Sequence, residues 1–428
     1  MDALTAEYFY TFLQFIEREQ FESKVCNARP DSTRALSSLW NADTNVKKEN
    51  GDIIVDLQIA DLRISDGVDA VCLCMLDKES LPNFRIGDSV IFYQRQSDVD
   101  SAVTQQVLRC SVESYGEGYV WLKLKNKQRN EKVFNKDAKY AIEHDHVDTN
   151  FRSLYSGLFS LLTCSKHRRE LLLCQREPAV EDLFLLVGPP GTGKTSVALK
   201  CMVEEHLQAE HDILLLAYTN RAVDEICAML SAIESHPQYI RIGREFSCAP
   251  HYQDNLLENM LGKLSNRQEV IEKVKDTHIF VSTVASMNSH FALFKLKHFQ
   301  VAIFDEASQI LEPHLLSILT SPAIDKIIMI GDHKQLPAVV VQDEKQSAVA
   351  SPMLHAIGLT NCRNSLFERL YEKYRHREDI VAMLNHQGRM HPDIAAFASR
   401  LFYENRLLPV GLPHQKENLL FTNYDEAD

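Results

Sequence analysis

The sequence predicts an α/β fold, with a parallel sheet that is covered by helices on both faces. First, short apolar strands alternate with helical stretches from residue 183 onward, at 183–187, 213–217, 239–242, 278–282, 301–304 and 326–330. Such alternation is typical of βαβ units. Second, a glycine-rich turn follows the first of these strands directly. Third, an acidic pair follows the strand at 301–304. Both features belong at the carboxyl edge of a parallel sheet.

The residues before this region predict a different architecture. Apolar positions at helical spacing predict a helix over residues 4–24. Helical periodicity returns over 147–174. Between the two helices, short alternating runs separated by glycines predict strands at 53–59, 70–75, 89–93, 106–112 and 119–124. Five or more short strands at this spacing favour a small closed barrel.

The turn after the strand at 183–187 predicts a phosphate-binding loop. It reads Gly188, Pro189, Pro190, Gly191, Thr192, Gly193, Lys194 and Thr195. Glycines let backbone N–H groups approach phosphates closely. We expect Lys194 to reach the β- and γ-phosphates and Thr195 to offer its hydroxyl to Mg²⁺. A helix predicted over 196–208 would direct its N-terminus at the phosphates. The loop therefore predicts a nucleoside triphosphatase.

Two further strand ends carry residues suited to this chemistry. We expect Asp305 to hold the metal ion together with Thr195, and Glu306 to orient and deprotonate the attacking water. The alternative is a helix N-terminus favoured by negative charge. After the strand at 326–330, Gln335 is placed to reach the γ-phosphate and report its presence. The alternative for Gln335 is an ordinary polar loop.

Composition narrows the class of protein. Of the 428 residues, 45% are hydrophobic and 25% charged, which is ordinary for a globular chain. No apolar run reaches the roughly 18 residues of a membrane span, and the N-terminus is acidic where a signal peptide is basic. The ten cysteines form no CxxC pair, which predicts free thiols and no zinc or iron–sulfur site. We expect a soluble cytoplasmic protein with no membrane partner.

Charge bears on nucleic-acid binding in two ways. The formal net charge of −13 argues against a general nucleic-acid coat, but it does not decide local binding. One basic stretch stands out, with Lys123, Lys125, Lys127, Arg129 and Lys132 within ten residues. It is either a solvated hairpin rim or a nucleic-acid contact.

Five sequence blocks occur in an order that resembles superfamily 1 helicases. They are GPPGTGKT at 188–195, AYTNRAVDEI at 217–226, DEASQ at 305–309, GDHKQLP at 331–337 and QGRMHP at 387–392. They look most like the 5′→3′ branch that contains the nonsense-mediated-decay helicase, senataxin and the immunoglobulin-μ-binding helicase. The resemblance implies a RecA-like ATPase that uses ATP and Mg²⁺, acts as a monomer, and moves on single-stranded DNA or RNA.

The resemblance also implies roles for particular residues. Four of them match motifs that contact the nucleic-acid backbone, or else they cap strand ends: Thr219, Asn220, Ser282 and Thr283. Arg389 matches an arginine directed at the γ-phosphate, where a cation stabilises the charge of phosphoryl transfer. Its alternative is a surface ion pair. Gln175 is a candidate for the adenine-reading glutamine, although its spacing to Gly188 is short.

Two departures from the family pattern matter. Gly388 stands where the family usually has a tyrosine that stacks on the base, so base selectivity is expected to be weak or supplied elsewhere. The chain also stops soon after the first motif of the second RecA-like domain. We therefore expect a fragment that binds nucleotide and turns it over slowly. The alternative function is a nucleotide-switched module that binds nucleic acid or protein without unwinding. A ring-forming ATPase is disfavoured, because that class has no GDHKQLP or QGRMHP block.

These patterns predict five segments. They are an N-terminal helical stalk at 1–48, a small β-barrel at 49–143, a second stalk helix and linker at 144–178, a first RecA-like domain at 179–345 with a helical insert at about 245–276, and a linker with the start of an incomplete second RecA-like domain at 346–428.

Overall fold

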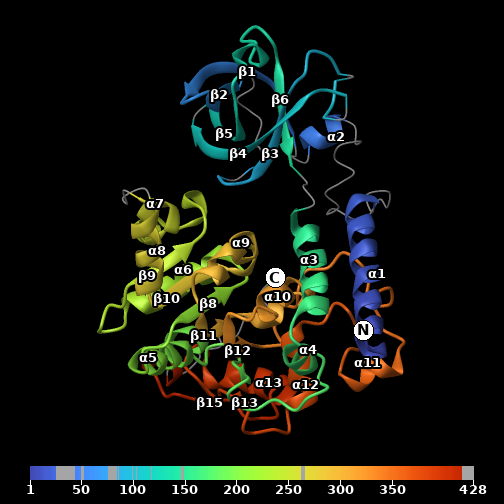
Figure 1. Cartoon of the computed structure of the whole chain (residues 1–428), viewed down its shortest axis with the longest axis vertical. Coiled ribbons are helices and arrows are strands. Elements are labelled where there is room, and N and C mark those ends of the chain that lie inside the picture. The colour runs from blue at the N-terminus through green and yellow to red at the C-terminus, as the bar shows by residue number, and fades with distance from the viewer. Residues whose placement is uncertain are drawn as a thin grey trace, which may run out of the picture. The chain divides into compact units, whose positions relative to one another are not determined.

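The computed structural model describes most of the chain (Figure 1). The described residues are 1–25, 44–49, 53–75, 84, 86–98, 100–102, 104–116, 118–145, 149–261 and 266–416. The chain forms two compact units, one of residues 1–15 with 153–428 and the other of residues 16–152. The predicted boundaries of the five segments remain predictions.

The smaller unit contains a closed antiparallel barrel with the strand order β1-β2-β5-β4-β3-β6. The strands are β1 (Ile53–Ile64), β2 (Val68–Met75), β3 (Ser89–Gln94), β4 (Val107–Gly116), β5 (Tyr119–Gln128) and β6 (Tyr140–His144). Alternate side chains of these strands fill the interior, as expected for a barrel of this size. The predicted barrel is confirmed. Its sixth strand, β6, was not predicted; it closes the barrel by pairing with β1 and β3.

Helices precede and follow the barrel in sequence. They are α1 (Ala3–Val25), α2 (Thr44–Glu49), α3 (Thr149–Thr163) and α4 (Lys166–Leu172). Within the larger unit the start of α1 packs on α3, where the rings of Phe9 and Phe159 meet edge to face with centroids 5.3 Å apart. In the part of the chain that the structure describes, no helix has both the length and the apolar character needed to cross a bilayer.

The larger unit is built on a seven-stranded parallel sheet with the order β13-β7-β12-β11-β8-β10-β9. Its strands are β7 (Leu183–Val187), β8 (Ile213–Ala217), β9 (Tyr239–Ile242), β10 (Ile279–Thr283), β11 (Phe299–Phe304), β12 (Ile324–Gly331) and β13 (Val381–Met383). The predicted α/β fold is confirmed. The seventh strand, β13, was not predicted, and it extends the sheet beside β7.

Both faces of this sheet are buried. On one face, side chains of α5 (Lys200–Gln208) and α6 (Asn220–Ser231) join one core cluster with alternate residues of β8, such as Ile213 and Leu215. On the other face, Leu214, Leu216 and Phe304 have no exposed surface. Burial on both sides explains why strands such as β7 and β8 are continuously apolar.

The remaining α-helices and strands of the larger unit include α10 (Glu312–Leu319), which is largely buried, and those of its C-terminal part. They are α7 (Leu257–Leu261), α8 (Arg267–Asp276), α9 (Val284–Ser289), α10, α11 (Pro352–Ala356), α12 (Leu366–Tyr374), β14 (His386–Gln387), α13 (Pro392–Phe402) and β15 (Leu408–Pro409). The short helices α7 and α8 fall in the predicted helical insert.

A buried ion pair ties several of these helices together. The Arg369 guanidinium on α12 donates to both carboxylate oxygens of Glu312 on α10, at 2.9 and 2.5 Å. The hydroxyl of Tyr8 on α1 donates to the same carboxylate at 2.5 Å. Arg369 also donates to the Leu172 carbonyl at the end of α4. All three side chains are at most 1% exposed. The Glu312 carboxylate and its partner Arg369 therefore connect α1, α4, α10 and α12 inside the larger unit.

Candidate nucleotide-binding and catalytic site

The phosphate-binding loop lies between β7 and α5. The Gly188 N–H donates to the Gly331 carbonyl at 2.9 Å, which fixes the loop to the end of β12. The following turn is wider than an α-helical one, because the Ala198 N–H donates to the Gly193 carbonyl five residues back, at 3.0 Å. Residues 194–199 form this π-type turn, and the regular helix α5 begins at Lys200. The sequence predicted a helix over 196–208; the chain is helical across this range, but its first turn is of the π type. Such wide turns are frequent at functional sites.

Two of the loop glycines are required by close approach. A Cβ at Gly188 would lie 2.1 Å from Cγ of Lys194, so only glycine lets the lysine fold back over the loop. Gly191 has φ of +75°, and a Cβ there would lie 2.4 Å from Cβ of Arg389. The loop is therefore packed tightly against its own lysine and against the segment that carries Arg389.

Four predicted site residues come together at the carboxyl edge of the sheet. The Thr195 hydroxyl donates to Oδ2 of Asp305 at 2.8 Å. Lys194 Nζ donates to the Gly188 carbonyl at 2.9 Å and lies 3.7 Å from Oε1 of Glu306. Segments more than 100 residues apart thus supply a hydroxyl, an ammonium and two carboxylates to one place.

Burial shapes the chemistry of the acidic pair. Asp305 is 2% exposed. Burial raises the pKa of this carboxyl to about 6, while its hydrogen bond from Thr195 opposes the rise and the neighbouring Glu306 charge adds to it. Glu306 has a left-handed backbone with φ of +52°, and its Oε2 accepts a hydrogen bond from Gln309 Nε2 at 3.2 Å. A backbone of this kind is uncommon outside glycine and is frequent at functional sites.

The donor set at this point fits Mg²⁺. A hydroxyl and a buried carboxylate oxygen, Thr195 Oγ1 and Asp305 Oδ2, are hard oxygen donors already in contact. Mg²⁺ is usually held by one or two such protein oxygens, with substrate phosphates and water completing its shell.

In this structure Gln335 contacts Asp332, and its predicted contact with a γ-phosphate remains a prediction. Its side-chain amide donates to Oδ2 of Asp332 at 2.6 Å. That carboxylate has no exposed surface, and the same oxygen accepts a hydrogen bond from the Tyr403 hydroxyl at 2.7 Å. Sequence reasoning missed both partners. The position of Asp332 within the GDHKQLP block was an available signal, whereas nothing local marks Tyr403.

The segment with Gly388 and Arg389 lies directly against the phosphate-binding loop. The Gly388 N–H donates to the Gly191 carbonyl at 2.9 Å. Arg389 follows on the next position, with an exposed side chain. A Cβ at Gly388 would lie 3.1 Å from Cδ1 of Leu412, so a larger residue here requires that leucine to shift.

The four residues assigned to nucleic-acid contact differ in their surroundings. Thr219 and Thr283 are N-caps, and their side chains accept hydrogen bonds from Ala222 N–H and Ser286 N–H. Thr219 and Asn220 are exposed at the end of β8. Ser282 has no exposed surface, and its hydroxyl donates to backbone carbonyls. In this structure the Ser282 hydroxyl is therefore buried and bonded within the sheet.

Two further predicted features, Gln175 and the basic stretch at 123–132, precede the strands of this sheet in the sequence. Gln175 is exposed in the turn after α4, where Cys174 has φ of +52°. In the barrel, two of the five basic residues are held by neighbours: Lys125 Nζ donates to Ser89 and lies 3.3 Å from Asp145, and Lys127 Nζ donates to the Ser65 carbonyl. All five basic side chains are exposed.

The fold and the loop define a P-loop ATPase domain, and comparison with known proteins narrows the class. Two family models, each described as an AAA domain, match this chain. One covers residues 165–277 and 255–343, and the other covers residues 362–424. Together they account for more than half of the chain.

Similar proteins carry helicase names. The "DNA replication ATP-dependent helicase/nuclease DNA2" of Xenopus laevis is 31% identical over 258 residues, which is 58% of this chain and 22% of that protein. Its Saccharomyces cerevisiae namesake is 32% identical over 230 residues, 53% of this chain and 14% of that protein. The solved Arterivirus nonstructural protein 10 (helicase) is 10% identical, with 83% of this chain and 60% of that chain covered and a TM-score of 0.37.

The two family models and the two curated relatives identify the chain as a member of the superfamily 1 helicases. The chain spans about a fifth or less of the length of the two curated relatives described above.

Proposed function

We propose that this chain supplies the ATPase core of a motor that couples ATP hydrolysis to movement along single-stranded DNA or RNA, in the 5′→3′ direction. The observation that carries the proposal is the meeting of Lys194 and Thr195 with Asp305 and Glu306 at one edge of the sheet. Phosphoryl transfer in P-loop enzymes uses a lysine at the β- and γ-phosphates, a hydroxyl and a carboxylate for Mg²⁺, and a residue that orients the attacking water.

Each residue has a defined task in this proposal. Lys194 leaves Glu306 and binds the β- and γ-phosphate oxygens of ATP as a point charge. Thr195 and Asp305 hold Mg²⁺, which, when bound, neutralises charge on the phosphate oxygens. Glu306 orients the attacking water and accepts its proton. Gln309, which donates to the other oxygen of Glu306, keeps that carboxylate in place.

Residues outside this cluster contribute the remaining groups. Arg389 stabilises charge on the transferring phosphoryl group, as a cation placed against the loop. Gln335 contacts the γ-phosphate, and Gln175 reads the base. Thr219, Asn220 and Thr283 donate to the sugar–phosphate backbone of the strand, in contacts that carry no sequence information. Ser282 supports this edge from within the sheet.

The test is the Glu306→Gln variant. We expect ATP binding to persist while hydrolysis falls by about 100-fold or more, because the amide cannot accept a proton. Glu204→Gln is the matched control, since Glu204 is a surface residue of α5; its rate should stay at the wild-type value. Rates are measured with and without single-stranded DNA and RNA. Wild-type hydrolysis by Glu306→Gln would remove the assigned base, and turnover that ignores both strands would remove the motor.

A second candidate is a nucleotide-switched binding module that does not unwind. The observation that favours it is the contact of Gln335 with Asp332, because a residue that changes partners with nucleotide serves a switch as well as a motor. Strand displacement on duplexes with 5′ or 3′ single-stranded overhangs separates the two. A motor of the proposed direction opens the duplex with the 5′ overhang, whereas a switch binds both and opens neither.

A further inference from the structure

A buried carboxylate links the Gly331–Pro337 loop to the end of α13. Asp332 has no exposed surface. Its Oδ1 accepts the Lys334 N–H at 3.0 Å. Its Oδ2 accepts two side-chain donors, Gln335 Nε2 at 2.6 Å and the Tyr403 hydroxyl at 2.7 Å. A buried charged oxygen requires donors, so these two side chains share the task of satisfying one atom.

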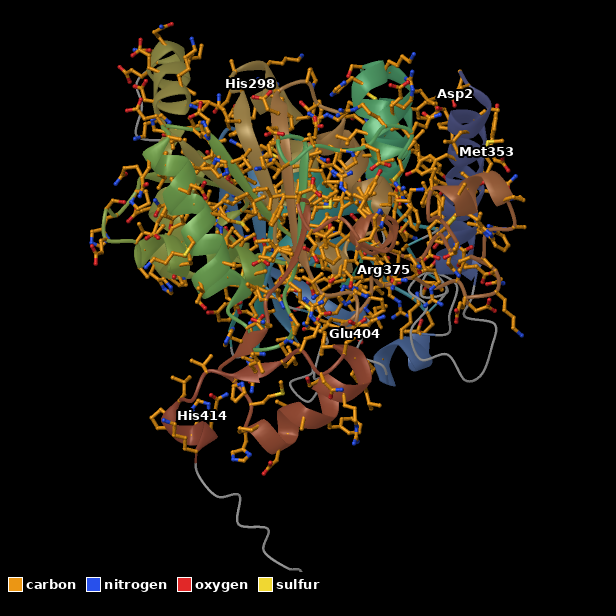
Figure 2. The ribbon with its side chains drawn as sticks, turned by 90° about the horizontal axis from the view of Figure 1, so that it is seen from below. Asp2, His298, Met353, Arg375, Glu404 and His414 are labelled. Atoms are coloured by element: carbon orange, nitrogen blue, oxygen red, sulfur yellow. The ribbon has the colours of Figure 1, made fainter. Side chains whose placement is uncertain are left out.

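The position of Tyr403 is defined by a constrained turn. Glu404, labelled in Figure 2, and Asn405 have φ of +54° and +60°, an uncommon pair of consecutive left-handed residues without glycine. The Asn405 N–H donates to the Ser399 carbonyl at 3.0 Å, which closes the turn back onto α13. Tyr403 itself is 6% exposed. The hydroxyl is thereby held at a fixed point against Asp332, 71 residues away in sequence.

A cavity of about 100 Å³ lies beside Tyr403, and its lining also includes Val187 at the end of β7 and His333 next to Asp332. Asp332 also contacts the segment that follows Glu306, because its backbone N–H donates to Oγ of Ser308 at 3.2 Å. Asp332 is therefore in contact with the segment after Glu306, with Gln335 and with the end of α13.

We propose that Tyr403 is a positioning residue for Gln335, an inference that rests on the proposed role of Gln335 at the γ-phosphate. The Tyr403 hydroxyl takes up part of the accepting capacity of Asp332 Oδ2. Gln335 is then held less tightly and can turn its amide to the phosphate. Without the hydroxyl, Gln335 is the remaining side-chain donor to that oxygen, and the charge retains it.

The test measures how well the protein distinguishes ATP from ADP. The readout is the ratio of the dissociation constants for ADP and a non-hydrolysable ATP analogue, so slow turnover does not matter. Gln335→Ala should lower this preference for the triphosphate. Tyr403→Phe should lower it by about tenfold, the effect of changing one hydrogen bond to a charged group. In the double variant, Tyr403→Phe should add nothing to Gln335→Ala, because its effect passes through Gln335.

The matched control is Tyr371→Phe. Tyr371 lies on α12 and packs against His333, with ring centroids 4.5 Å apart. The Tyr371→Phe variant loses a hydroxyl in the same region, and its ratio of the two dissociation constants should equal that of the wild type. If Tyr403→Phe leaves the ratio unchanged while Gln335→Ala lowers it, the inference about Tyr403 is wrong but the proposed role of Gln335 stands. An equal loss from Tyr403→Phe with and without Gln335 also overturns the inference about Tyr403. An unchanged ratio in Gln335→Ala overturns the proposed role of Gln335 and the inference with it.

Discussion

Removal of Arg369 should destabilise the larger unit strongly. The Arg369→Met variant keeps the length of the side chain but leaves the Glu312 carboxylate, which has no exposed surface, without its cation. An uncompensated buried charge costs about 3 to 5 kcal/mol. For a unit of this size, that cost lowers the melting temperature by roughly 8 °C. Thermal unfolding followed by circular dichroism measures the change directly.

Two companion variants identify the cause. The double variant Arg369→Met, Glu312→Leu should recover at least half of the loss, because it removes the charge as well as its partner. Arg377→Met is the control, since Arg377 pairs with Glu177 and Asp379 at the surface, where an ion pair contributes little. If Arg369→Met melts with the wild type, or if the double variant is no more stable than the single one, buried charge is not what makes this contact important.

Three further outcomes are expected. Lys194→Ala should weaken binding of an ATP analogue by about 100-fold, measured by fluorescence titration, because two charge-assisted contacts to phosphate are lost; unchanged affinity would contradict the site. Burial lowers the pKa of His314 to about 4. Between this pH and the ordinary histidine pKa of about 6.5, the His314 side chain is protonated in the unfolded chain but neutral in the folded one. Stability should therefore fall by up to about 1.4 kcal/mol per pH unit as pH decreases from 6.5 towards 4, and urea unfolding of His314→Gln should lack this component. Replacement of Lys123, Lys125 and Lys127 by alanine should lower single-strand affinity and the salt dependence of binding; unchanged affinity leaves this stretch as solvated surface.

The sequence predicted the sheet well because its central strands are buried on both faces. Such strands are continuously apolar, as in Ile213–Ala217, and no pairing partner needs to be known to recognise them. The two strands that were missed are defined by long-range pairing. β13 has three residues and exists because it aligns with β7, almost 200 residues earlier. β6 closes the barrel between β1 and β3, which no local pattern specifies.

The candidate site shows the same division. The phosphate-binding loop and the Asp305–Glu306 pair were predictable, because glycine spacing and a strand followed by two acids are local patterns. The contact of Asp332 with Tyr403 joins residues 71 positions apart and leaves no periodic trace. For Thr219 and Thr283, the same hydroxyl suits both a helix N-cap and a backbone contact, so residue type alone could not separate the two roles.

The C-terminal segment is attached to the first domain in two distinct ways, and the difference locates the point at which it can move. β13 is part of the sheet, and the Leu384 N–H still donates to the Val187 carbonyl at 2.9 Å. Beyond that residue, attachment depends on isolated contacts, Gly388 N–H to the Gly191 carbonyl and the Tyr403 hydroxyl to Asp332. A strand within a sheet moves only when several hydrogen bonds break together, whereas single contacts exchange one at a time. We therefore expect a rotation of this segment to pivot after Leu384 and to change the contacts at the phosphate-binding loop and at Asp332 in the same movement.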